Sequence, residues 1–175
     1  MKQLQYIFIL FAIGVILFNA CETPRSYPET PEVEFKSVSI TDAQDTLGNV
    51  VKLIRLTISV VDGDGDIGIF YLNSNSIYPG FEDLGNANLF IKQYEKIDGE
   101  FVELDSVYNY ATPFLEPEGQ DKTLKADIEV RIDYPVVLYD YDTIKYSFYI
   151  YDRAMHISNT AETPEIPFDT LGIIE

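Results

Sequence analysis

Several residue types are scarce or missing in this chain, and each shortage excludes a class of function. The 175 residues include no tryptophan, one cysteine, one histidine, and 12 lysines and arginines against 29 aspartates and glutamates. One cysteine cannot form an internal disulfide, and a zinc site typically needs several His or Cys ligands. A net charge of −17 repels phosphate groups, which excludes nucleic acids and leaves divalent cations as the natural charged partners. The same acidity also serves solubility.

Long apolar runs are missing too, with one exception at the N-terminus. Tyr6 to Phe18 is an apolar run, Lys2 is the only charge in the first twenty residues, and Cys21 follows the run closely. A signal-peptide core needs roughly 7–15 apolar residues, whereas a membrane-spanning helix needs about 20. The sequence therefore predicts a lipoprotein signal peptide over residues 1–20, cleavage before Cys21 and lipidation of its thiol. A retained signal anchor is the alternative.

A polar, proline-rich stretch separates Cys21 from the rest of the chain. Three prolines fall between Glu22 and Glu32, which predicts a lipidated cysteine and tether over residues 21–32. Eleven residues in polyproline conformation, at about 3.1 Å each, would hold a domain about 30 Å from the membrane. Residues 33–175 are then predicted to form the domain. The mature chain from Cys21 is about one domain in length, and loss of Lys2 with the signal makes its net charge −18.

From Val33 onward the apolar residues repeat with a period of two, which is typical of strands with one buried face. Asp98-Gly99 between two such segments is a strong hairpin signal, because this turn needs positive φ at both residues. Pro164 confines the last expected strand to a sheet edge. The expected strands are Val33–Ile40, Ile54–Val60, Ile67–Leu72, Leu89–Lys96, Phe101–Val107, Leu124–Ile132, Ile144–Ile150 and Thr160–Ile166.

These seven or eight short strands, with no helical period, predict an all-β fold. An antiparallel β-sandwich of immunoglobulin-like type fits best, and a small barrel is the alternative. The 13 tyrosines and 11 phenylalanines agree with this, since aromatic residues favour pleated surfaces.

The sharpest chemical motif is Asp62-Gly63-Asp64-Gly65-Asp66, directly after the strand Ile54–Val60. Carboxylates at alternate positions, with glycines to bend the backbone, can direct several oxygens at one Ca²⁺ ion, which takes six to eight. In a sandwich, the loop after Tyr151 would lie at the same end as this loop. The alternative is that the aspartates only cap tight turns through backbone amides. The predicted calcium ligands are Asp62, Asp64, Asp66, Asp152 and Asn159.

Three short motifs are spread along the chain: Val60 to Gly68, Thr112 to Lys122 and Tyr151 to Pro164. In these motifs the chain resembles small Bacteroidota lipoproteins with a single immunoglobulin-like domain. The resemblance implies an outer-membrane lipoprotein with a β-sandwich and no catalytic residue. Surface display in this phylum is associated with a charged signal just after the lipidated cysteine. Glu22 matches it poorly, so the membrane side stays open.

Four Asp-Ser or Asp-Thr triplets resemble the O-glycosylation acceptor pattern of the same phylum. Ordinary turn chemistry is the alternative, because Asp-Thr is common in turns. The candidate acceptors are Thr46, Ser106, Thr143 and Thr170.

Catalysis is not expected from these residues. A Ser–His–Asp triad would have to use His156, yet the chain has no nucleophile-elbow sequence. Carboxylates are plentiful, so counting alone leaves a glycosidase pair open. We expect a lipid-anchored, non-catalytic module of the cell envelope that binds an envelope protein or a glycan. A structural accessory subunit of an outer-membrane complex is the alternative, and a glycan-processing enzyme is a remote one.

Overall fold

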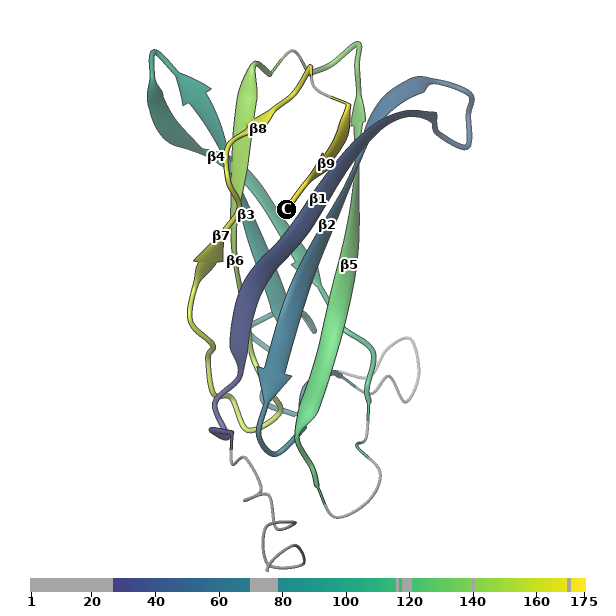
Figure 1. Cartoon of the computed structure of the whole chain (residues 1–175). Helices are drawn as coiled ribbons and strands as arrows, with labels where there is room; N and C mark the ends of the chain where they lie inside the picture. Colours follow the sequence, from purple (N-terminus) through teal and green to yellow (C-terminus); the bar gives the residue numbers. More distant parts are fainter. Residues whose placement is uncertain (1–26, 70–78, 116, 118–120, 140, 170) are drawn as a thin grey trace, which may run out of the picture.

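The computed structural model of this chain describes residues 27–69, 79–115, 117, 121–139, 141–169 and 171–175. Within these ranges the chain is all-β and forms two antiparallel sheets (Figure 1). No helix that could span a membrane occurs in this part of the chain. The predicted signal peptide and Cys21 lie outside the described residues. The strands are β1 (Glu32–Gln44), β2 (Val50–Asp62), β3 (Leu89–Ile97), β4 (Glu100–Tyr110), β5 (Leu124–Pro135), β6 (Thr143–Ile150), β7 (Ala161–Glu162), β8 (Ile166–Pro167) and β9 (Gly172–Ile174).

The two sheets are separate layers. The first has the strand order β5-β2-β1-β9 and the second β4-β3-β6-β7, with β8 also paired to β6. Each sheet ends in edge strands, so the barrel alternative is wrong and the arrangement is consistent with a β-sandwich. The all-β prediction is confirmed.

Strand β2 shows why the sequence forms this architecture. Ile54, Leu56 and Ile58 alternate with polar residues, and all three are fully buried. Because β1 and β5 pair with β2 along nearly its whole length, its backbone groups are satisfied on both sides. The alternation therefore fixes which face meets the second sheet.

The Asp98-Gly99 turn forms as predicted. Asp98 has φ 53° and Gly99 has φ 88°, and they join β3 to β4. Both angles are those that a tight two-residue hairpin turn requires.

The C-terminal strands differ from the prediction. Thr160–Ile166 is not one strand but the two short strands β7 and β8, which flank Pro164 and pair with β6. Proline has no N–H to donate to a sheet, so the pairing is interrupted there. Strand β9, which the sequence did not predict, pairs with β1. Of the expected strand Ile67–Leu72, Ile67 and Ile69 form isolated bridges, and the residues after Ile69 lie outside the described ranges.

A polar network crosses the core between the sheets. The Tyr134 hydroxyl donates to Gln93 Oε1 at 2.8 Å and lies 2.6 Å from the Tyr146 hydroxyl. Burial is the main cause that raises the pKa of Tyr134 and Tyr146 far above the ordinary value, so both hydroxyls stay protonated. The network pairs the two buried tyrosine hydroxyls with Gln93 Oε1, while Gln93 Nε2 has no hydrogen-bond partner among the described residues.

The strand directions give the domain two distinct ends (Figure 1). We call the end where the described chain begins the tether end, and the opposite one the distal end. The tether end contains residues 27–31, 63–69, 111–115 and 151–160, and the distal end contains residues 45–49, 98–99, 136–139 and 168–169.

Part of the predicted tether lies against the domain. Pro28 O accepts a hydrogen bond from Gly63 N at 2.8 Å, the Tyr27 hydroxyl accepts one from Lys125, and Glu32 already belongs to β1. Residues 27–32 therefore lie against the domain, and an independent spacer can include only residues before Tyr27.

Candidate functional site

Three carboxylates converge at the tether end. One oxygen from each of Asp62, Asp66 and Asp152 lies within 4.8 Å of the others. Asp62 and Asp152 are fully buried, and Asp66 is half-buried. We call these three residues the aspartate cluster.

The two sheets supply the cluster jointly. Asp62 is the last residue of β2 in the first sheet, and Asp152 follows β6 in the second. An isolated antiparallel bridge between Ile67 and Asp152 draws the loop after β2 toward β6. The backbone N–H of Arg153 donates to Asp66 O at 3.2 Å, and this bond also holds the loop after β2 close to the end of β6.

The glycines of the motif are needed for close packing. A Cβ on Gly63 would collide with the backbone oxygens of Tyr27 and Pro28. Gly65 has φ 68°, and a Cβ there would collide with Lys122 O and Pro117. The loop can therefore lie against neighbouring backbone only because both positions lack a side chain.

The cluster holds more negative charge than its surroundings compensate. Asp62 Oδ2 accepts a hydrogen bond from Asp66 N at 2.8 Å. However, Asp62 Oδ1 and Asp66 Oδ1 are buried without a partner among the described residues. Burial, with the Asp64 charge as the next cause, raises the pKa of Asp62 to about 7. Burial and the Asp152 charge also raise the pKa of Asp66. Buried carboxylates with a raised pKa favour a bound proton or a bound cation, because either one compensates their negative charge.

His156 orients the third carboxylate. Its Nδ1 lies 2.8 Å from Asp152 Oδ2, and its backbone N–H donates to Asp152 Oδ1 at 2.7 Å. The hydrogen bond to Asp152 raises the pKa of His156 above its ordinary value. Because the imidazole holds the Asp152 carboxylate in one orientation, the remaining lone pairs of that carboxylate have a fixed direction.

Two predicted calcium ligands are not in the cluster. Asp64 is exposed and is not one of the three converging residues. The Asn159 amide makes two hydrogen bonds to Val33, accepting from its N–H at 2.9 Å and donating to its C=O at 2.8 Å. Asn159 thus ties β1 to the loop after β6.

The other predicted sites are scattered. Thr46 is exposed in a turn where Asp45 accepts from Leu47 N and Asn49 N. Ser106 on β4 and Thr143 on β6 are half-buried. Cys21 and Thr170 lie outside the described residues, and glycosylation remains a prediction.

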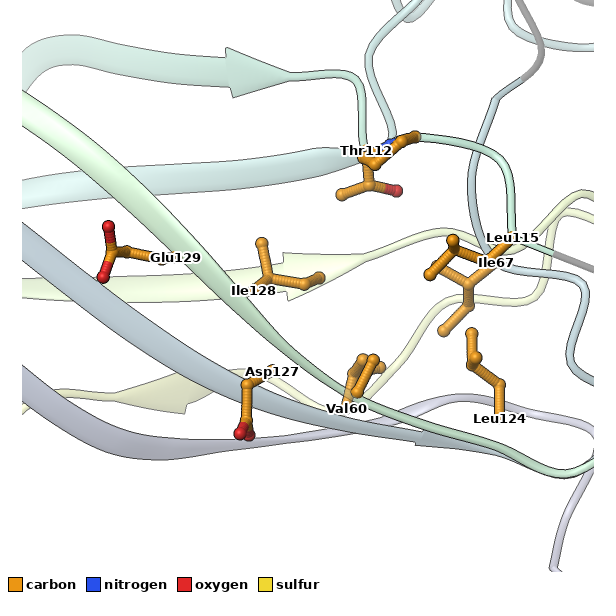
Figure 2. A pocket seen from close by; sticks show the side chains of 10 residues that line it. Val60, Ile67, Thr112, Leu115, Leu124, Asp127, Ile128 and Glu129 are labelled. Carbon is orange, nitrogen blue, oxygen red and sulfur yellow. The ribbon is translucent and has the colours of Figure 1, made fainter.

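A cavity of about 220 Å³ lies beside the cluster, between β5 and the segment after β4. Figure 2 shows the side chains of Val60, Ile67, Leu115, Leu124 and Ile128 around it, while the carboxylate of Asp127 points away. The Thr112 hydroxyl at its edge is already bonded to Asn88. The lining is therefore apolar and brings no acid–base pair together.

The distal end carries a feature that the sequence reasoning missed. Ten of the thirteen large hydrophobic side chains that are exposed in the described chain lie in the distal half of the molecule. Leu47, Val137 and Leu138 are 85%, 84% and 72% exposed. The backbone bond from Val136 N to Val50 O joins two of the loops involved. We call Leu47, Val50, Val136, Val137 and Leu138 the apolar tip.

Comparisons of this chain with protein-family models, with curated proteins and with solved structures found no match.

The cluster predicts an unusual pH dependence of stability in the presence of a chelator. The domain should gain melting temperature as the pH falls from about 8 to about 5.5. The pKa of Asp62 is about 7 in the folded state against 3.8 ordinarily, so folding takes up a proton in this range. The raised pKa of His156 acts in the same direction. Thermal melts of the wild type and Asp62→Asn test this. The variant should show a smaller gain, and equal gains would contradict the prediction.

Proposed function

We propose that this chain is a lipid-anchored lipoprotein of the cell envelope, held in the outer membrane through Cys21. Its domain is a non-catalytic binding module that docks onto another envelope protein. The observation that carries this proposal is the apolar tip. Exposed apolar patches rimmed by polar groups mark protein–protein contacts in otherwise soluble domains.

The domain is of immunoglobulin-like type in this proposal. The run β1-β2-β5 in one sheet and β4-β3-β6-β7 in the other supports it. These orders correspond to strands A-B-E and C′-C-F-G of such sandwiches. The resemblance to Bacteroidota lipoproteins supports the same assignment.

The position of the apolar tip favours a partner that approaches the domain from the side facing away from the anchoring membrane. The chain enters the domain at the tether end, and the 12 residues of β5 separate the two ends by about 40 Å. A lipid on Cys21 therefore places the apolar tip on the side of the domain that faces away from the bilayer.

Charge narrows the class of partner further. Asp98, Glu100 and Asp142 are exposed at the distal end. The neighbouring cations Lys52 and Lys96 are each paired with a carboxylate. This surface repels anionic lipids and fits a protein face that is apolar with a basic rim.

A photo-crosslinking amino acid at Leu138 is expected to capture one major protein in cells. The same amino acid at Glu34, exposed on β1, is the matched control and should capture little. Val137→Asp should abolish the Leu138 product, because it puts a charge into the apolar contact. High salt should weaken capture if the partner's rim is basic.

Capture at both positions alike, or unchanged capture with Val137→Asp, would contradict docking through the tip. A saccharide-only product would instead favour the glycan-binding role. A structural accessory role would use the same surface and would appear as loss of the partner complex when the tip is mutated.

A further inference from the structure

We propose that Asp62, Asp66 and Asp152 form a Ca²⁺ site at the tether end of the domain. This site is independent of the apolar tip, which lies at the opposite end. Either proposal can therefore fail without the other.

Buried, unsatisfied charge is the first argument. Asp62 is fully buried, yet its Oδ1 has no hydrogen-bond partner in the described chain, and Asp66 Oδ1 is in the same state. A native buried carboxylate oxygen without a partner is rare and costly. A cation bound among the three carboxylates would be coordinated by carboxylate oxygens and would compensate their buried negative charge.

Turn capping alone does not explain the cluster. Asp62 caps the loop with Oδ2, through the amide of Asp66, and this needs only one oxygen. Asp152 caps its own turn through the backbone N–H of His156 and also holds the His156 ring, but neither contact requires it to lie within 4.8 Å of Asp62 and Asp66. Three carboxylates from two sheets at this spacing repel one another unless something positive lies between them.

The chemistry of the three residues favours calcium over other metals. Oxygens at 2.3–2.6 Å from one ion are spaced about as these carboxylates are. Zinc prefers His and Cys ligands, whereas the three converging residues are all aspartates. Mg²⁺ demands stricter octahedral geometry. Because Asp66 is only half-buried, water can reach the site next to it and supply the remaining ligands of the ion.

Three protein carboxylates with water as the remaining ligands predict modest affinity. Extracellular calcium modules of this kind bind with Kd of about 10⁻⁴–10⁻³ M. At ten times Kd, the melting temperature of a domain of this size should rise by roughly 3–6 °C.

The test combines thermal melts with direct binding on the mature chain without its lipid. After chelation, CaCl₂ is added while the melting temperature and the bound calcium are measured, the latter by equilibrium dialysis. We expect saturable binding of one ion per chain with the stated shift. Asp62→Asn should melt higher than the wild type in chelator, because it removes a buried charge, and should lose the calcium response.

Asp64→Asn is the matched control, since Asp64 is on the same loop but exposed and outside the cluster. It should keep most of the response. Three results would overturn the proposal: no saturable binding in the wild type, an unchanged response in Asp62→Asn, or a loss in Asp64→Asn as complete as in Asp62→Asn. An equal response to Mg²⁺ would overturn the assignment to calcium.

Discussion

A Cys21→Ala protein is expected to lose all lipid and to accumulate as an unprocessed precursor. Cys21 is the only thiol in the chain, so no other residue can take its place. Each methylene of an acyl chain contributes about 0.8 kcal/mol to membrane binding, and stable anchoring takes more than one chain. Palmitate labelling and precursor size are the measurements.

The controls separate anchoring from folding. Thr23→Ala keeps the thiol and should be processed and labelled normally. A soluble chain that begins at Glu22 should melt at the temperature of the lipidated protein, because β1 begins only at Glu32. Normal palmitate labelling of Cys21→Ala would refute the lipoprotein prediction, and with it the membrane orientation given to the apolar tip.

The sequence could predict the central strands because burial there follows a simple alternation. Ile54, Leu56 and Ile58 of β2 face the core at every second position, and Ile144, Tyr146 and Phe148 of β6 do the same. A strand whose inner face is fully buried cannot shift its register by one residue without exposing that face. The Asp98-Gly99 turn was equally predictable, since few residue pairs tolerate its backbone angles.

Short edge strands were not predictable in this way. β9 has only three residues, and Ile173 within it is 70% exposed, so no alternation marks it. β7 and β8 are two residues each and depend on the edge of β6 for their pairing. Their existence follows from where β6 lies, which is a property of the whole fold.

The aspartate cluster was predictable at the level of topology but not of individual side chains. Sandwich connectivity suffices to bring Asp152 to the end where Asp62 and Asp66 lie. Asn159 lies at the same end, but the backbone of Val33 takes its amide. Asp64 lies between Asp62 and Asp66 in the sequence, yet it is exposed to solvent, where its charge is better hydrated. Competing hydrogen bonds keep Asn159 out of the aspartate cluster, and hydration keeps Asp64 out of it.

The apolar tip shows a different limit of sequence reasoning. Val136, Val137 and Leu138 follow β5 directly, and such a run in a sequence suggests a buried segment. Only the strand directions reveal that this loop extends past the core together with Leu47 of another hairpin. The exposure of these three residues therefore depends on the fold, and their sequence alone does not indicate it.

Phe148→Ala is expected to destabilise the domain far more than Tyr149→Ala, the neighbouring substitution on the other face of β6. Phe148 is fully buried in the centre of β6, between Ile91 of β3 and Ala161 of β7. Phe→Ala changes in cores typically cost about 3–5 kcal/mol, because a cavity remains where the ring was. Urea unfolding of the wild type and the variant measures the difference.

Tyr149→Ala is the neighbouring control, and it tests the two-layer arrangement itself. Tyr149 points to the outer face, where its ring stacks on Phe90 with centroids 5.3 Å apart. Tyr149 is only half-buried, and a ring pair of this kind contributes about 0.5–1.5 kcal/mol beyond its buried area, so the control should lose clearly less stability than Phe148→Ala. Equal losses would mean that both faces of β6 are packed to the same degree, which would contradict a sandwich with one outer face open to solvent.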